Sequence, residues 1–142
     1  MNILVSSCLL GLDCRYNATS CFSESVAALS GIHTLIPICP EQMGGLPTPR
    51  QPLERSRGLV IDKDSRDYTA ALEKGADEVL RIAKLCNCTH AITKSRSPSC
   101  GCGLIYDGTF SRHMTEGNGI AVDKLLAAGI KVTDENHLSY YL

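Results

Sequence analysis

The sequence predicts an α/β protein with a Rossmann-like, three-layer αβα architecture and a mostly parallel sheet. Short apolar runs at 2–7, 33–39, 89–95 and 130–135 read as strands, and helical patterns separate them. Strands that alternate with helices form parallel sheets, whose ligand sites lie beyond the carboxyl ends of the strands. A chain of 142 residues that is 44% hydrophobic can bury one core, so we expect residues 1–142 to form a single domain.

The first half of the chain predicts a strand, a helix and a second strand. Strand 2–7 ends in small polar residues and opens into a loop at Cys8. A helix is expected over 20–29, with Ser20 or Ser23 as N-cap and Gly31 as its end. It leads directly into the second strand.

Pro37 lies within strand 33–39 and favours an edge position, because proline cannot donate to a neighbouring strand. Residues 40–56 contain four prolines and two glycines and are expected to be an irregular functional loop. The main helix is expected over 65–86, where Gly75 is tolerated at a cost of about 1 kcal/mol. After strand 89–95 comes a second loop, and a helix ending at Gly129 precedes the last strand.

Composition and charge favour a small substrate in a reducing compartment. The net charge of −1 provides no basic excess for binding long nucleic acids. The N-terminal segment has no basic start, and Ser6, Ser7 and Cys8 interrupt its apolar run, so neither a signal peptide nor a membrane span is expected. We therefore expect a cytoplasmic protein, in which eight cysteines point to metal binding or catalysis rather than to disulfides.

Three cysteines follow the ends of three predicted strands. Cys8, Cys39 and Cys100 are far apart in the sequence, yet a parallel sheet would bring them to one edge. Each alone could be a small buried apolar residue, but their shared position favours a common metal or nucleophile site. The C-x-x-C pairs typical of structural zinc are absent, and thiolates suit an iron–sulfur cluster, which can leave one iron without a protein ligand.

The remaining candidates are weaker. Cys86 and Cys88 end the main helix at the opposite edge of the sheet, where a packing role is favoured. The roles of three further cysteines stay open, and the four histidines are expected at the surface or in packing positions. These residues are Cys14, Cys21, Cys102, His33, His90, His113 and His137.

Three segments carry a family resemblance. "SSCLLGLDCRYN", "ICPEQMGGLPTPRQPLE" and "KSRSPSCGCGLIYDGTF" resemble the signature segments of the bacterial thiouracil desulfidase family, and the resemblance covers essentially the whole chain. It implies a Rossmann-like domain that holds a [4Fe-4S] cluster through Cys8, Cys39 and Cys100. It also implies a fourth iron that takes the sulfur of a thiolated base, and hydrolysis of thiouracil to uracil and sulfide.

The resemblance also implies two catalytic residues. The acid of the C-P-E motif is Glu41, and the serine that contacts the substrate is Ser97. Glu41 would accept the proton of an attacking water as a general base. The alternatives are a carboxylate that satisfies the amides of a helix start and, for Ser97, a helix cap. Four basic residues would offset the charge of thiolates and sulfide or form a solvated rim: Arg50, Arg55, Lys94 and Arg96.

The sequence therefore predicts a [4Fe-4S]-dependent desulfidase that acts on thiolated uracil-type bases. Its expected partners are a small thiolated pyrimidine and the cluster-assembly machinery, and protein handled in air can lose the cluster. The alternative is a carrier of iron–sulfur clusters or sulfur, which would have no use for a general base such as Glu41. A phosphate-binding Rossmann module is disfavoured because no G-x-G-x-x-G follows the first strand.

Overall fold

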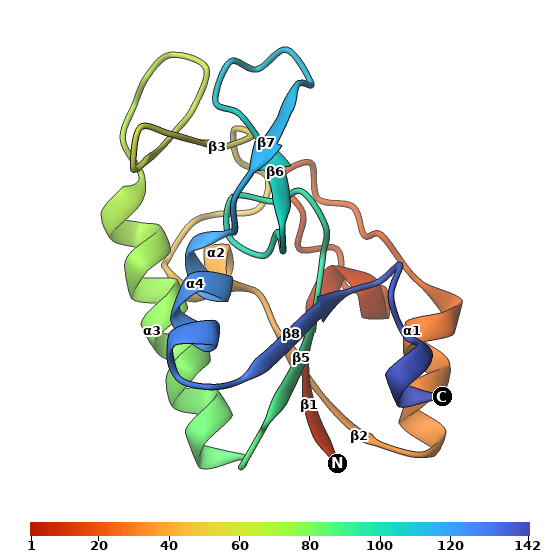
Figure 1. Ribbon diagram of the computed structural model, residues 1–142. Helices are drawn as coiled ribbons and strands as arrows, with labels where there is room; N and C mark the ends of the chain where they lie inside the picture. The colour runs from red at the N-terminus through yellow and green to blue at the C-terminus, as the bar shows by residue number, and fades with distance from the viewer.

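A four-stranded, all-parallel sheet forms the centre of the computed structural model, which describes all 142 residues (Figure 1). The strands are β1 (Asn2–Ser6), β2 (Thr34–Ile38), β5 (His90–Thr93) and β8 (Lys131–Asp134), and their order across the sheet is β2-β1-β5-β8. The predicted parallel α/β architecture is confirmed. The edge position expected for Pro37 is confirmed too, because β2 is an outer strand.

Helices cover both faces of this sheet. Helices α3 (Thr69–Leu85) and α4 (Ile120–Ala127) lie on one face, and α1 (Glu24–Ala28) lies on the other with the C-terminal 3-10 helix η3 (Ser139–Tyr141) (Figure 1). Successive side chains of a strand point to opposite faces of the sheet, and both faces of β1 are covered by helices. Ile3 and Val5 pack in the core under α1, and the intervening Leu4 packs under α3 and α4.

The short helix α2 (Pro40–Met43) crosses α3 at very close range. A Cβ atom on Gly75 would lie 1.8 Å from the carbonyl oxygen of Pro40, and one on Gly44 would lie 2.1 Å from that of Ala71. Only glycine permits this approach. Gly75 is therefore a packing requirement of α3, rather than a tolerated weakness as the sequence pattern alone indicates.

Two small antiparallel hairpins stand above the carboxyl ends of the central strands (Figure 1). One joins β3 (Glu54–Ser56) to β4 (Leu59–Ile61), and the other joins β6 (Leu104–Tyr106) to β7 (Met114–Glu116). Neither was predicted, because three-residue strands are too short to display a periodic pattern. The expectation that residues 40–56 lack regular structure is wrong at both ends, which form α2 and β3.

Element boundaries differ from the prediction by a few residues. Ser23, not Ser20, caps α1: its side chain accepts a hydrogen bond from the amide of Val26. A 3-10 helix, Leu29–Gly31, continues α1, so the helical segment ends at Gly31 as predicted. Helix α3 begins at Thr69 rather than at residue 65. No helix in the structure has the length and apolar character needed to cross a membrane.

Candidate active site

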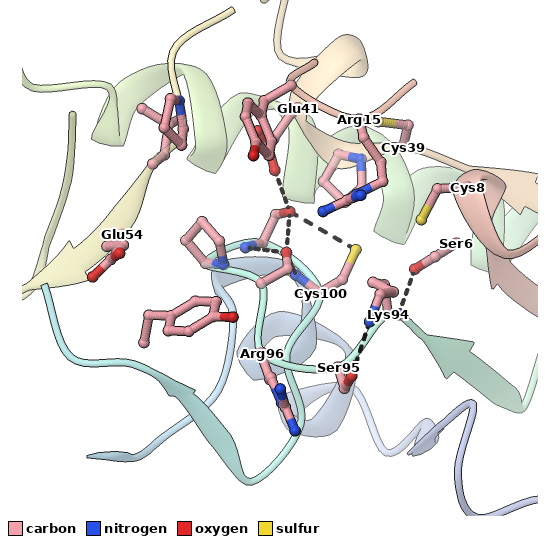
Figure 2. A pocket seen from close by; sticks show the side chains of 18 of the residues that line it. Ser6, Cys8, Arg15, Cys39, Glu41, Glu54, Lys94, Ser95, Arg96 and Cys100 are labelled. Atoms are coloured by element: carbon pink, nitrogen blue, oxygen red, sulfur yellow. Dashed lines mark hydrogen bonds between the residues drawn. The ribbon is translucent and has the colours of Figure 1, made fainter. Parts of the chain in front are cut away.

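A cavity of about 730 Å³ opens at the carboxyl ends of β1, β2 and β5. Its wall contains thiols, hydroxyls, two carboxylates and several cationic side chains (Figure 2). Parallel strands all end at this edge, so residues from distant parts of the sequence meet there. This is the place at which the sequence predicts a ligand site.

The three predicted ligand cysteines all line the cavity. Cys8 lies in the 3-10 helix η1 (Ser7–Leu10) directly after β1, and Cys39 is the residue between β2 and α2. Cys100 lies in the loop that follows β5, where it is buried. Figure 2 shows the three side chains on the same side of the cavity, with the sulfur atoms of Cys8 and Cys100 directed into it.

Cys14 is a fourth thiol in the same wall, a position that the sequence left open. It is buried, and its backbone carbonyl accepts a hydrogen bond from the thiol of Cys39 at 4.0 Å. The hydrogen bond with the Cys39 thiol lowers the pKa of Cys14, whereas contact with the Cys8 thiol and burial raise it, to about 11 overall. Cys14 therefore belongs to the thiol group and not to a separate loop core.

Packing also disfavours the thiolate forms of two predicted ligands. Burial raises the pKa of Cys100 to about 12. Contact with the Cys14 thiol, together with burial, raises the pKa of Cys39 far above its ordinary value. Metals bind thiolates, so loading of this site must release protons.

No three histidine, cysteine, aspartate or glutamate side chains lie close enough together to hold a single metal ion. In an iron–sulfur cluster, by contrast, different irons take different thiolates, so the ligand sulfurs stand farther apart than those around one ion. A set of four thiols in one cavity, with no histidine in its wall, fits a thiolate-ligated cluster in its donor chemistry.

Glu41 lies in α2 and is held by a buried ion pair. Nε of Arg50 donates to Oε1 of Glu41 at 3.0 Å, and the two side chains are only 7% and 14% exposed. Arg50 also donates through Nη2 to the carbonyl of Cys14 at 2.8 Å. Of the two roles that the sequence leaves open for Arg50, a solvated rim is wrong, because its guanidinium is buried and joins the thiol-bearing loop to the candidate base.

A chain of hydroxyls links Ser97 to Glu41. Ser99 Oγ donates to Oε2 of Glu41 at 2.9 Å, and it lies 2.9 Å from Ser97 Oγ. A hydroxyl has one hydrogen, so Ser97 must donate to Ser99 once Ser99 donates to the carboxylate. Ser97 Oγ also accepts hydrogen bonds from the amides of Ser99 and Cys100. The two predicted catalytic residues are thus connected through Ser99.

The other predicted basic residues occupy different places. Lys94 lines the cavity and pairs with Glu135 at 2.7 Å, and Arg96 lines it without an ion-pair partner. Arg55 does not line the cavity: it pairs with Asp123 at 2.8 Å, beside the start of α4. The expectation that Arg55 belongs to this site is wrong in geometry.

Several cysteines and all histidines lie outside the cavity. Cys86 and Cys88 follow α3 at the opposite end of the sheet and pack in the core beneath α3, as predicted. The thiol of Cys102 contacts the carbonyl of Val132 at 3.8 Å, and Cys21 packs under α1. Neither Cys21 nor Cys102 lines the cavity.

Sequence reasoning missed three residues of the site: Ser99, Glu54 and Glu135. The Oγ of Ser99 could have been suspected from its place in the "SPSC" segment, one residue before Cys100. Glu54 and Glu135 offer no such signal. Glu54 follows a proline-rich segment, and Glu135 follows the last strand, so only the tertiary fold brings them to the cavity or its rim.

Fold and site together define a small parallel α/β protein with a thiol-lined cavity at the sheet's carboxyl edge. The chain belongs to the 2-thiouracil desulfurase family, whose model matches residues 3–137. The family predicted from the three signature segments is therefore confirmed.

Two individual relatives match over nearly the whole chain. The uncharacterized protein YbbK of Bacillus subtilis (strain 168) is 39% identical over 147 aligned positions, which cover 96% of this chain and 97% of that protein. A solved structure of the [4Fe-4S]-dependent thiouracil desulfidase TudS is 37% identical, with a TM-score of 0.93 over 99% of this chain and 94% of that one. That similarity extends the match from sequence to fold.

Proposed function

We propose that this protein is a [4Fe-4S]-dependent desulfidase that hydrolyses thiolated uracil-type bases to uracil and sulfide. The observation that carries the proposal is the joint placement of Cys8, Cys39 and Cys100 with Glu41 and Ser97 around one cavity. Membership in the 2-thiouracil desulfurase family and similarity to TudS, which is [4Fe-4S]-dependent, support the same chemistry.

Cys8, Cys39 and Cys100 are the proposed ligands of the cluster. When bound, the cluster would supply an iron that accepts the soft thiocarbonyl sulfur and draws electron density from the ring carbon. The buried thiols would release their protons when the cluster binds. The proposal includes a reducing compartment such as the cytoplasm, where thiols stay free. It also includes a partner from the cluster-assembly machinery, which would deliver the cluster.

Glu41 is the proposed general base. Its carboxylate accepts a proton from water as the water oxygen attacks the thiocarbonyl carbon, a role often worth about 10² to 10⁴ in rate. The carbon–sulfur bond then breaks, the ring keeps the oxygen, and sulfur leaves as sulfide with no net change of oxidation state. Arg50 holds the carboxylate in place, and Ser97 contacts the substrate at the other end of the hydroxyl chain.

The test begins with anaerobic reconstitution, followed by iron analysis and sulfide release from 2-thiouracil. Cys100→Ser should abolish cluster binding, whereas Cys88→Ser should leave iron per chain unchanged, because Cys88 lies outside the cavity. Equal loss of iron in both variants would overturn the ligand assignment.

Glu41→Gln should retain the cluster and lose about 10² or more in turnover, which is roughly 3 kcal/mol of transition-state stabilisation. A carrier of clusters or sulfur would give at most one sulfide per protein and no dependence on Glu41. Many sulfides released per chain, with loss in the Glu41 variant, distinguish the desulfidase from that alternative. Normal turnover in Glu41→Gln with an intact cluster would refute the assignment of Glu41 as the base.

A further inference from the structure

Glu54 is a second carboxylate in the cavity and lacks the ion pair that holds Glu41. Glu54 lies at the start of β3 and is only 9% exposed. No lysine, arginine or histidine forms a salt bridge with it, whereas Glu41 pairs with Arg50. A buried carboxylate without a counter-charge is costly unless hydrogen bonds stabilise it. The hydrogen-bond partners of Glu54 therefore decide how it is stabilised.

One oxygen of Glu54 is fully used within the protein. Oε1 accepts hydrogen bonds from the amides of Gly108 at 3.0 Å and Phe110 at 3.1 Å. These amides belong to the turn between β6 and β7, in which Gly108, Phe110 and Arg112 all have positive φ. Such a turn is intrinsically unfavourable for Phe110 and Arg112 and needs outside support, which Oε1 provides.

The other oxygen, Oε2, makes no hydrogen bond in the structure. Glu54 lines the cavity, and Figure 2 places it on the side away from Cys8, Cys39 and Cys100. A ligand whose sulfur faces the thiols would therefore turn its ring toward Glu54. A carboxylate only accepts hydrogen bonds, so the matching group on the ligand is a donor.

Thiolated uracils carry such a donor. In 4-thiouracil N1–H lies across the ring from the thiocarbonyl carbon and so points away from the sulfur, whereas the carbonyl oxygen of the ring is an acceptor that a carboxylate repels. We propose that Glu54 is a specificity-determining residue whose Oε2 accepts a ring N–H of the substrate, while Oε1 holds the β6–β7 turn against the cavity. This inference rests on the proposed function, because it assumes a thiolated pyrimidine in the cavity.

The two oxygens can be separated by substitution. In Glu54→Gln the amide oxygen can still accept hydrogen bonds from the amides of Gly108 and Phe110. An NH₂ group replaces Oε2, however, so a donor would then face the donor N–H of the ring. Glu54→Ala removes both interactions. Glu116→Gln, an exposed position on β7 away from the cavity, is the matched control.

Hydrogen exchange of the Gly108 and Phe110 amides tests the turn without any cluster or activity. Glu54→Gln and Glu116→Gln should keep the protection of the unaltered protein, and Glu54→Ala should lose it. Loss of protection in Glu54→Gln as well would overturn the division of roles between the two oxygens.

Kinetics of the reconstituted protein test recognition. For 4-thiouracil, Glu54→Gln should raise KM about tenfold with kcat nearly unchanged, as expected when a hydrogen bond to a charged group is lost from substrate binding. The unaltered protein should discriminate against 1-methyl-4-thiouracil, in which N1–H is replaced, and Glu54→Gln should lose that discrimination.

The outcomes are distinct. If the reconstituted, unaltered protein releases no sulfide from 2-thiouracil, the proposed function fails and the role of Glu54 falls with it. If it releases sulfide but Glu54→Gln has an unchanged KM for 4-thiouracil and the same preference for 4-thiouracil over its N1-methyl form, only the role of Glu54 is overturned.

Discussion

Ser99 donates a hydrogen bond from Oγ to Oε2 of Glu41 across 2.9 Å, and this contact joins two segments that are 58 residues apart. Glu41 lies in α2 directly after Cys39, and Ser99 precedes Cys100, so the bond ties together the backbones that carry two of the proposed ligands. Ser99 lies in the cavity wall but is only 2% exposed, and its hydroxyl is bonded to Glu41 and Ser97. It is therefore a positioning residue.

Ser99→Ala should lower turnover by about tenfold to hundredfold without lowering iron content. The variant removes the donor to Glu41 and the acceptor of Ser97, and a hydrogen bond to a charged group contributes about 1.5 to 3 kcal/mol. Because the Ser99 hydroxyl acts through Glu41 and Ser97, we expect kcat to fall more than KM rises. Ser111→Ala, in an exposed part of the β6–β7 turn, is the control and should behave as the unaltered protein. An unchanged kcat in Ser99→Ala would remove Ser99 from the mechanism.

Arg50→Met should destabilise the protein by about 3 kcal/mol, even before a cluster is bound. Removing one partner of a buried ion pair leaves a charge uncompensated, which is far more costly than losing a surface pair. The carbonyl of Cys14 also loses its donor. Urea denaturation of the cluster-free protein measures the effect, with Arg81→Met on the exposed side of α3 as control. Equal stability of the two variants would show that the Glu41–Arg50 pair does not support the fold.

The position of the thiol group was predictable because it depends on topology alone. Parallel strands end at one edge, so Cys8 after β1, Cys39 after β2 and Cys100 after β5 had to approach one another once the strands were identified. No knowledge of side-chain packing was needed. The same reasoning correctly set Cys86 and Cys88 apart, because they precede β5 at the other end of the sheet.

The polar framework of the site was not predictable in this way. The Ser97–Ser99–Glu41 chain depends on how the loop after β5 is fixed, and the start of α4 fixes it through hydrogen bonds from the amides of Ile120 and Ala121 to the carbonyls of Pro98 and Ser99. Such contacts follow from the tertiary fold and leave no period in the sequence.

Gly75→Ala should destabilise the protein by about 2 kcal/mol or more, although helix propensity alone predicts a gain of about 1 kcal/mol. The added Cβ would lie 1.8 Å from the Pro40 carbonyl oxygen, a backbone atom that cannot move without shifting α2. Since α2 carries Glu41, turnover should fall as well. Thermal unfolding compares this variant with Gly31→Ala, whose Cβ would meet nothing within 4 Å. A stabilised Gly75→Ala would mean that α2 does not pack on α3 as closely as described.

The buried carboxylate of Asp62 should make the stability of the protein depend on pH in the acid range. Burial acts to raise the pKa of Asp62, but hydrogen bonds from the amides of Arg66 and Asp64 and the charge of Arg66 outweigh it and hold the pKa below its ordinary value. A carboxyl group with a lowered folded pKa binds its proton more weakly in the folded state than in the unfolded state.

The stabilisation from Asp62 is therefore complete above the pKa that Asp62 has in the unfolded chain, about 4. It disappears as the pH falls through the lower pKa that Asp62 has in the folded protein. Asp62→Asn should be less stable than the unaltered protein at pH 7, and the difference in the free energy of unfolding should shrink steadily below about pH 4. Chemical denaturation at a series of pH values measures it, with Asp64→Asn as control because the Asp64 side chain is 57% exposed and its pair with Arg66 lies at the surface. A difference that stays constant with pH would show that the ionised form of Asp62 contributes nothing to folding.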